Sequence, residues 1–539
     1  HYIFHRYEPR EPLLHLCLLG IPPVLLSTIL RHYFGTPASI LVSYLVFLVV
    51  LAFSVVVHRI SPFHPLARFP GPLSHKISRL SLTSIALSCR EHVHIHELHE
   101  HYGDVVRIGP NEVSIRDPSV IPGVLGTTGF PRSDCTSYSA CSLHPPIQPL
   151  LNISGEEHTA KRRWWNRGFT SAALKEYEPI VARHVEKLVD SLSRDEEVIE
   201  MSVRFSWLRY SSDNVSYQFS FGAASDMLVK GDQGGIWRII QNGFTAAHVF
   251  THIPWLSFYI SKLVALGLNQ NVKLMRQYGV DRARERLERG SLMKDLFYYL
   301  NNEDGAEERG RPLSHVINDG ALAIVAGGDT TSNVLSSICY FLLNNPTVYK
   351  SLQAEVDKYY PPGEAAVETM HHQNMPILNA VINESLRLLP VLPEGTSRVS
   401  PPGGRSVGTY YIPEGTKTMI HAYSVNRDPR NFSPRTTTFW PDRWLIASGD
   451  MTASEAGIDK REFVHNSSAF IPFSFGPANC VGKNLALQEM RMTICSILQR
   501  LQLRFAPGFD PASYEVRLRD YMILKSAPLP MEVRVRDRI

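Results

Sequence analysis

The chain has 539 residues, of which 44% are hydrophobic and 20% are charged, proportions that are ordinary for a globular protein. Its formal net charge at pH 7 is only +4, so the sequence gives no support for a nucleic-acid partner. The seven cysteines are dispersed and lack the spacing of a zinc site. Such a set is typical of reduced thiols that face a cytosol-like compartment.

Two apolar segments stand near the start of the chain. Residues 39–57 are 19 residues without a charge, which is long enough to cross a bilayer as one helix. Residues 13–30 are also apolar but are broken by Pro22 and Pro23, so a second span and a re-entrant or interfacial piece both remain open. We predict a membrane anchor over residues 1–60 with one or two spans. Basic residues that follow the apolar segment 39–57 predict a cytosolic domain: Arg59, Arg68, Lys76, Arg79 and Arg90.

The rest of the chain reads as one large domain. Residues 61–76 are rich in proline and predict a stiff linker. A helix that ends at Gly103 and a hairpin over residues 104–117 follow, and residues 155–390 are mainly helical in pattern. A further helix is predicted over 481–503, with short strands at the C-terminus. We therefore expect a domain over residues 77–539 that is mainly α with small β-sheets.

A run of histidines lies in the predicted helix before Gly103. His92, His96 and His99 would share one face of that helix, which invites a metal-binding interpretation. No carboxylate–histidine pattern with the spacing of an open metal site accompanies them. Histidines on the surface of a helix are the simpler interpretation.

A single cysteine stands in a stiff turn, "FSFGPANCVG", residues 473–482. Gly476 and Pro477 predict a tight turn, Gly482 permits a close backbone approach, and a helix begins directly after Cys480. The N-terminus of that helix favours a thiolate over a thiol. Such a thiolate could be a nucleophile or a metal ligand. Because the turn brings no companion ligands, a haem, which supplies four of its own, is favoured.

This turn resembles the haem-binding loop of the cytochrome P-450 family, whose pattern is FxxGxRxCxG. Phe473, Gly476, Cys480 and Gly482 match the pattern, and Ala478 replaces the arginine that contacts a haem propionate in the family. The variant Gly-Pro-Ala-Asn resembles fungal members of the family. The resemblance assigns Cys480 as the axial ligand of the haem iron.

Distant stretches resemble further motifs of the same family. "NESLR" places Glu384 and Arg387 three residues apart on one helix face, like the family's ExxR motif. Arg443 in "WPDRW" matches the third member of the network that braces the core behind the cysteine loop. "AGGDTTS" matches the (A/G)GxDT pattern, which makes Asp329 and Thr330 the acid and alcohol that relay protons during O2 activation.

Two more segments match residues that hold the haem propionates in the family. In "EEHTAKRRWWNRGFT", His158 and Arg162 lie four residues apart, and Arg398 lies in "LPEGTSR". Together these three could compensate for the arginine that is missing from the loop. The resemblance covers essentially everything after the linker.

The resemblance implies a haem-thiolate monooxygenase with the cytochrome P-450 fold, haem b and an N-terminal transmembrane anchor. No dinucleotide or flavin signature is present, so the expected electron donor is an NADPH–cytochrome P-450 reductase, with cytochrome b5 as a second donor. Lys161, Arg163 and Lys483 could form its docking face. The endoplasmic reticulum membrane is the expected location, with the domain on the cytosolic face.

The substrate is expected to be lipophilic and small. By resemblance, the substrate pocket draws on mostly apolar positions: residues 125–150, Ala323, Ala326, Val391, Leu392, Tyr521 and Met522. A terpenoid of fungal secondary metabolism fits such a pocket.

Two other functions remain open at this stage. One keeps the haem fold but performs isomerisation or peroxide-driven chemistry, which would not need Asp329 and Thr330. The other is a membrane-anchored cysteine hydrolase in which Cys480 is the nucleophile, and it would need a general base from elsewhere in the chain.

Overall fold

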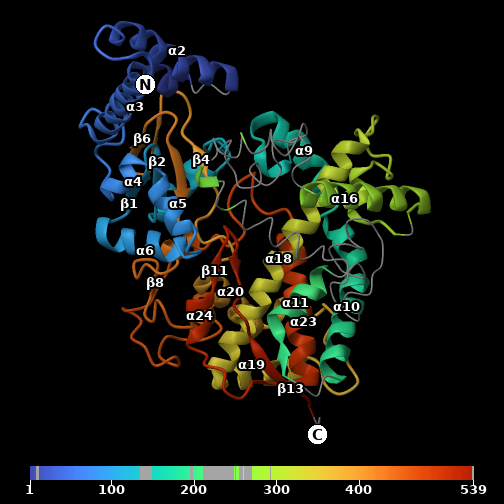
Figure 1. Cartoon of the computed structure of the whole chain (residues 1–539). Helices are drawn as coiled ribbons and strands as arrows, with labels where there is room; N and C mark the ends of the chain where they lie inside the picture. Colours follow the sequence, from blue (N-terminus) through green and yellow to red (C-terminus); the bar gives the residue numbers. More distant parts are fainter. Residues whose placement is uncertain are drawn as a thin grey trace.

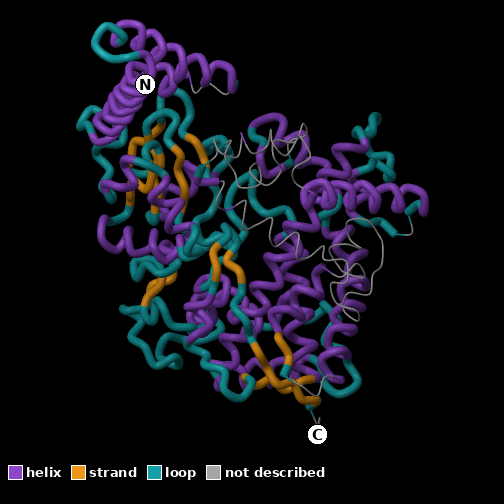
Figure 2. The backbone as a smooth tube through the Cα atoms, viewed as in Figure 1, coloured by secondary structure: helices purple, strands orange, loops and turns teal. Residues whose placement is uncertain are grey.

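The computed structural model describes residues 1–7, 11–133, 149–194, 198–210, 270–291 and 293–536, together with 248, 251–253 and 259. Helices form most of it, and the strands make small sheets at its margins (Figures 1 and 2). The predicted class, mainly α with small β-sheets, is confirmed.

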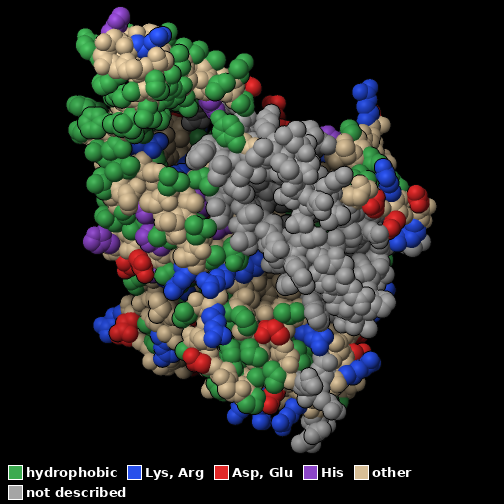
Figure 3. Space-filling view, in the orientation of Figure 1, with side chains coloured by type: hydrophobic (Ala, Val, Ile, Leu, Met, Phe, Trp, Pro, Cys, Tyr) green, Lys and Arg blue, Asp and Glu red, His purple; other side chains and the backbone are tan. Residues whose placement is uncertain are grey.

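The N-terminal helices project from the rest of the molecule (Figure 1). They are α1 (Tyr2–Tyr7), α2 (Pro12–Leu30) and α3 (Thr36–Ile60), and α2 packs on α3. Both long helices are apolar enough to cross a membrane, and Figure 3 shows apolar side chains gathered over them. The predicted break at Pro22 and Pro23 is wrong, because α2 runs through both residues. The two missing N–H groups are adjacent, so the loss is confined to one turn.

A four-stranded sheet with the order β1-β2-β7-β4 forms one side of the domain. The predicted hairpin is confirmed, since Val105 pairs with Ile115 and Arg107 with Val113. The predicted helix before it ends at Gly103, whose φ of +96° suits glycine. Elements of this part are α4 (Leu73–Ile77), α5 (Leu80–Ala86), α6 (Glu91–Tyr102), β1 (Val105–Gly109), β2 (Glu112–Ile115), α7 (Ile121–Leu125), β4 (Arg398–Val399), β5 (Arg405–Val407), β6 (Tyr410–Ile412), β7 (Lys417–Ile420), α21 (Ala422–Val425), β8 (Phe432–Ser433) and β9 (Val464–His465).

Long helices form the other side around one hydrophobic core. In α10, buried side chains recur every three or four residues, so one stripe of the helix faces this core. The elements are α9 (Gly155–Arg167), α10 (Ser171–Arg194), α11 (Met201–Tyr210), α16 (Gln270–Arg289), α17 (Leu296–Leu300), α18 (Leu313–Asn344), α19 (Pro346–Tyr359), α20 (Pro376–Leu388), α22 (Asp442–Ser448), α23 (Lys483–Arg500) and α24 (Ser513–Arg517).

The C-terminal segment forms the short strands that the sequence predicts. Their bounds are β10 (Leu501–Phe505), β11 (Arg519–Asp520), β12 (Leu524–Lys525) and β13 (Pro530–Val535), and β13 also pairs with β3 (Ile199–Glu200). The β11–β12 hairpin reaches α18, on which β12 packs. A C-terminal segment thereby contacts the central helix of the domain.

The proline-rich segment before α4 packs on the domain. Leu66 and Phe69 are buried in the cluster that includes strands β1 and β2. The N–H of Arg107 donates to the carbonyl of Pro70 at 2.7 Å. The carbonyl oxygen of Arg107 would lie 2.3 Å from a Cβ at Gly71, so that position needs glycine. The segment therefore fixes the end of α3 close to the sheet.

Candidate active site

The cysteine loop is held by its own backbone and by α7. The N–H of Cys480 donates to the carbonyl of Phe473 at 2.9 Å. Gly476 has a φ of +74°, and a Cβ there would lie 2.2 Å from the carbonyl oxygen of Leu125. A side chain at this position would therefore strain the turn and push the loop away from α7. α23 begins at Lys483, so the thiol stands just before a helix N-terminus as predicted.

Some features around the Cys480 thiol raise its pKa and others lower it. Although Cys480 is an exposed residue, protein atoms crowd its sulfur, and this desolvation raises the pKa of the thiol. The N–H groups of Gly482 and Lys483 and the positive charge of Arg162 lower it, as the sequence predicts, but they do not outweigh the desolvation. Without a bound cation the loop therefore favours the neutral thiol.

A group of basic side chains lies next to the loop. Arg162 of α9 donates to the carbonyl of Asn479 at 2.6 Å and to its side-chain oxygen at 2.9 Å. Arg132 donates to the carbonyl of Ala478 at 3.3 Å, and it forms a β-bridge with Arg398. Three arginines thus converge on the side of the loop where the family's arginine is missing.

The electrostatics of this group favour an anion. Burial, together with the charges of Arg398 and Arg162, lowers the pKa of Arg132 to about 9. His158 is buried, and burial followed by the same arginines lowers the pKa of its ring to about 4. Its Nε2 atom makes no hydrogen bond within the described part of the chain. A bound carboxylate would relieve the repulsion and use this atom.

The predicted Glu384–Arg387–Arg443 network is assembled and fully buried. Arg387 binds both oxygens of Glu384 at 2.8 Å, and Arg443 binds Oε1 at 3.1 Å. The indole N–H of Trp444 donates to Oε2 at 3.0 Å, and its ring packs on Phe470 with centroids 4.6 Å apart. Through this pair the network contacts the segment that leads into the cysteine loop.

The pKa of Glu384 follows from the same contacts. Burial alone would raise it, but Arg387, Arg443 and the N–H of Trp440 together lower it below the ordinary value. The carboxylate is therefore ionised and bound on both oxygens, as a rigid bracing group requires.

The segment "AGGDTTS" lies inside α18, which is continuous across both glycines. Asp329 is buried and forms an ion pair with Lys525 of β12. The hydroxyl of Thr330 donates to the carbonyl of Ala326 at 2.9 Å, so these two residues share one face of the helix. Ala326 is exposed in the middle of a helix that is otherwise largely buried, which marks an open space beside it.

Three side chains of this site were missed by the sequence reasoning. Arg132, Trp444 and Lys525 each contact a predicted residue or the cysteine loop from a distant part of the chain. Trp444 lies next to Arg443 in "WPDRW", which is the only local signal among the three.

Of the predicted substrate pocket, residues 134–148 lie outside the described residues. Ala323 is buried, and the carbonyl of Val391 accepts from the N–H of Leu524 at 2.9 Å.

Two sequence-based expectations about surface residues are wrong. Lys161 is buried and lies 3.8 Å from Asp319, so it is not part of a docking face. His92 and His99 are buried rather than on the surface, because α6 packs against β1. His92 lies 3.2 Å from a carboxylate oxygen of Asp520.

Comparison with known proteins decides the family. A model of the cytochrome P450 family matches residues 72–529, most of the chain. The chain belongs to the cytochrome P450 family. It is 32% identical to cytochrome P450 monooxygenase FCK2 of Fusarium pseudograminearum over 89% of this chain and 84% of that protein. It is 30% identical to cytochrome P450 67 of Uromyces fabae over 98% and 96% of the two chains.

Membership of the cytochrome P450 family establishes the predicted class, a haem-thiolate monooxygenase with the cytochrome P450 fold. The related cytochrome P450 monooxygenase orf5 of Eupenicillium brefeldianum, 31% identical over 90% of this chain and 94% of its own, agrees with that class. The hydrolase interpretation has no support from the site. Among the described residues, no histidine forms a hydrogen bond with Cys480.

The residues present fit a haem. The unpartnered Nε2 of His158 and three crowded arginines form an anion site, and Cys480 is an exposed residue beside it. A Cβ at Gly482 would lie 3.9 Å from the Cys480 sulfur, so glycine leaves that side of the sulfur free. A flat macrocycle with two carboxylates matches both features.

Proposed function

We propose that this chain is an anchored monooxygenase that oxidises a lipophilic small molecule with O2 and electrons from an NADPH–cytochrome P450 reductase. The observation that carries the proposal is the position of Cys480, an exposed residue just before α23 and beside the anion site of Arg132, His158, Arg162 and Arg398. Family membership supports the same chemistry.

The cofactor would be haem b, and the Cys480 sulfur would hold its iron. When bound, haem supplies the activation of O2 that amino-acid side chains cannot provide. The iron would also stabilise the thiolate that the loop alone does not favour. Phe473 and Gly476 fix the loop backbone, and Gly482 leaves room beside the sulfur. The network of Glu384, Arg387 and Arg443 would keep the cysteine loop in place.

The propionates would bind to the basic group beside the loop. Arg162 and Arg132 already hold the backbone of Asn479 and Ala478, so they would fix the loop and the cofactor together. His158 and Arg398 would complete the anion site. Arg132 takes the side of the loop on which the family's arginine is replaced by Ala478.

Asp329 and Thr330 would manage protons during the reaction. The Thr330 hydroxyl lies on the same face of α18 as Ala326, next to the open space, and can hold a water or a proton there. Asp329 is ion-paired with Lys525, which keeps a charged carboxylate at a buried position. Transient release of that pair would let Asp329 accept and return a proton.

The location would be the endoplasmic reticulum membrane, with residues 1–60 as the anchor and residues 77–539 as the catalytic domain on the cytosolic face. α2 and α3 support this arrangement by length and composition. Arg59 at the end of α3 donates to the carbonyl of Ile77 at 2.6 Å, which ties the anchor to the domain. Exposed basic residues such as Lys483 and Arg163 would face the reductase. Arg163 also forms an ion pair with Glu307 at 2.8 Å within the chain.

The substrate would be a terpenoid-like compound of fungal secondary metabolism. The apolar positions Ala323, Ala326 and Val391 support a lipophilic substrate, because they offer no charged partner.

The proposal is tested by co-expressing the full chain with a fungal reductase and supplying a panel of terpenoids under ¹⁸O2. We expect a product that gains one labelled oxygen atom and that requires both NADPH and the reductase. The same microsomes carrying Cys480→Ala serve as the matched control and should give no such product. Products that form without NADPH, or that carry no label, would instead support isomerisation or peroxide-driven chemistry.

A further inference from the structure

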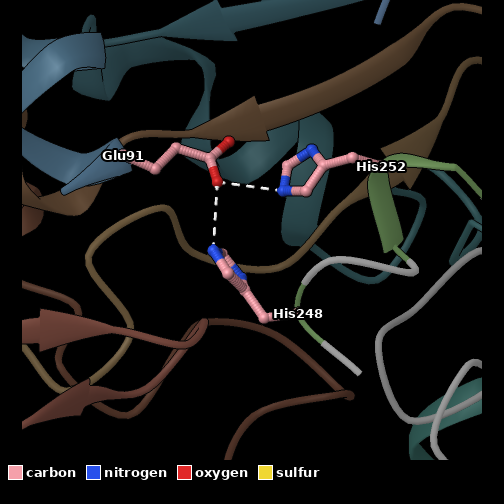
Figure 4. A group of neighbouring side chains, drawn as sticks. All are labelled: Glu91, His248 and His252. Carbon is pink, nitrogen blue, oxygen red and sulfur yellow. Dashed lines mark ion pairs between the residues drawn. The ribbon is translucent and has the colours of Figure 1, made fainter. Parts of the chain in front are cut away.

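Glu91, His248 and His252 form a compact cluster (Figure 4). Glu91 is the first residue of α6, and the two histidines are four residues apart, a spacing that places them on one helix face. The Nε2 atom of His252 lies 3.0 Å from Oε2 of Glu91, and the Nε2 atom of His248 lies 3.6 Å from the same oxygen. All three ligand atoms lie within 4.8 Å of one another.

The cluster is closed to solvent, and its polar atoms are not satisfied. The exposed fractions of Glu91, His248 and His252 are 0%, 1% and 5%. Within the described part of the chain, neither Nε2 atom makes a hydrogen bond, and the Glu91 carboxylate has no well-directed one, although the Glu394 side chain lies close enough to interact with it. The Nε2 atom of His252 lies 3.0 Å from Oε2 of Glu91, which is close enough for a hydrogen bond. The ring does not direct its N–H at that oxygen, so no hydrogen bond forms. Buried polar atoms that lie this close together without a hydrogen bond indicate that a shared partner, such as a metal ion, binds between them.

Two imidazoles and one carboxylate are a ligand set that Zn²⁺ takes in proteins, with bonds of about 2.0–2.2 Å. Tetrahedral ligands at that bond length lie about 3.3–3.6 Å apart, and the observed spacings of 3.0 and 3.6 Å are close to this range. We propose that Glu91, His248 and His252 bind one Zn²⁺ ion, and that this site is separate from the haem site.

The neighbouring charges are compatible with a cation. Glu394 lies beside Glu91 and Asp520, so three mutually repelling acidic side chains lie together here. A divalent ion between these acids and the histidines would offset that repulsion.

One contact favours a metal-free alternative. Arg79 lies 3.5 Å from Nδ1 of His252, and an arginine can only donate, so this contact would place the ring hydrogen on Nε2. Arg79 has a stronger partner, Glu112, at 3.0 Å. With zinc on Nε2 we expect Arg79 to stay with Glu112.

Zinc at this site would join α6 to the segment that carries His248 and His252. The two parts are more than 150 residues apart in the sequence, and the described contacts between them here are ion pairs alone. The ion would therefore act as a staple between them, independent of catalysis.

The test uses the full chain, purified in detergent without a histidine tag and treated with a chelator. Zn²⁺ is then added, excess ion is removed, and zinc per chain is measured by plasma mass spectrometry beside the haem content. We expect about one zinc per chain and a thermal midpoint that rises when zinc is added.

The variants Glu91→Gln and His252→Asn should each lower the bound zinc at least about fivefold and abolish the rise of the midpoint. His101→Gln is the matched control, because His101 lies on the same helix but is exposed. Wild-type chain that retains no zinc and shows no change of its thermal midpoint would overturn the proposal without any variant. Zinc binding that persists in both variants would overturn it as well.

Discussion

At residue 478 the chain has an alanine where its family has an arginine, and the compensation comes from far away in the sequence. Arg132 reaches the carbonyl of Ala478 across a sequence separation of 346 residues. Arg162 holds the next residue, Asn479. Residues from distant parts of the chain therefore hold this loop. Substitutions in the loop and substitutions of its partners should have effects that can be measured separately.

Gly476→Ala should displace the cysteine loop. The new Cβ would meet both a positive φ and the carbonyl oxygen of Leu125 at 2.2 Å. We expect the purified variant to lose most of its haem. Gly415→Ala is the matched control, since Gly415 has a φ of +71° but open space around it. The control should cost about 1–2 kcal/mol of unfolding free energy through backbone strain alone and keep its haem. Equal haem contents in the two variants would contradict the account.

Lys525→Met should weaken the coupling of electron flow to product formation. Without Lys525 the buried carboxylate of Asp329 loses its partner, and an uncompensated buried charge costs about 3–5 kcal/mol. We expect less product per NADPH consumed with unchanged haem content, and a larger loss of turnover, about 10²-fold, in Asp329→Asn. The measurement needs a substrate from the screen described above. Lys525→Arg keeps the charge and should behave nearly as wild type. If Lys525→Met formed as much product per NADPH consumed as wild type, the proposed role of Lys525 would be wrong.

At the scale of single elements, α20 and α18 show what a local pattern can reveal. Glu384 and Arg387 are three apart on α20, so their pairing could be predicted from spacing alone. The apolar spacing predicts a helical region around α18, but "AGGDTTS" itself weakens the pattern, so only the family resemblance assigns a function to this part of the helix. Burial of α18 in the core outweighs that weakness.

Glu384→Gln should destabilise the domain and flatten its pH dependence. The folded-state pKa of Glu384 is lowered, so the carboxylate contributes stability above its unfolded pKa of about 4.5 and loses it as the pH falls below that value. Breaking a buried ion pair costs about 3–5 kcal/mol, which we expect at pH 7. Urea unfolding between pH 7 and pH 4 checks this. The difference between wild type and variant should shrink toward pH 4, and a constant difference would be evidence against the assigned pKa shift.

At the scale of the whole molecule, the main feature is that two long apolar helices, α2 and α3, precede the rest of the chain. The anchor helices and the order of the helical and strand-rich parts could be predicted, because hydropathy and turn residues are local signals. The contacts of Arg132, Trp444 and Lys525 could not, because each joins segments that only the fold brings together. The unbroken α2 could not be predicted either, because a proline pair normally interrupts a helix.

Removal of residues 1–60 should release a folded domain from membranes, whereas removal of residues 1–72 should destabilise it. The longer truncation also deletes Leu66 and Phe69, whose burial is worth about 1.5–3 kcal/mol each. Sedimentation of membranes and thermal unfolding of the two truncated chains check this. Equal thermal midpoints would show that the proline-rich segment is only a linker.

The most direct test of the central claim is the absorption spectrum of the reduced, CO-bound protein, recorded for the full chain and for Cys480→Ala. The account predicts a strongly red-shifted Soret band in the wild-type chain that is absent from the variant, because the band requires a thiolate on the iron. A well-folded wild-type chain without this band, or a variant that keeps it, would contradict the assignment of Cys480 as the haem ligand.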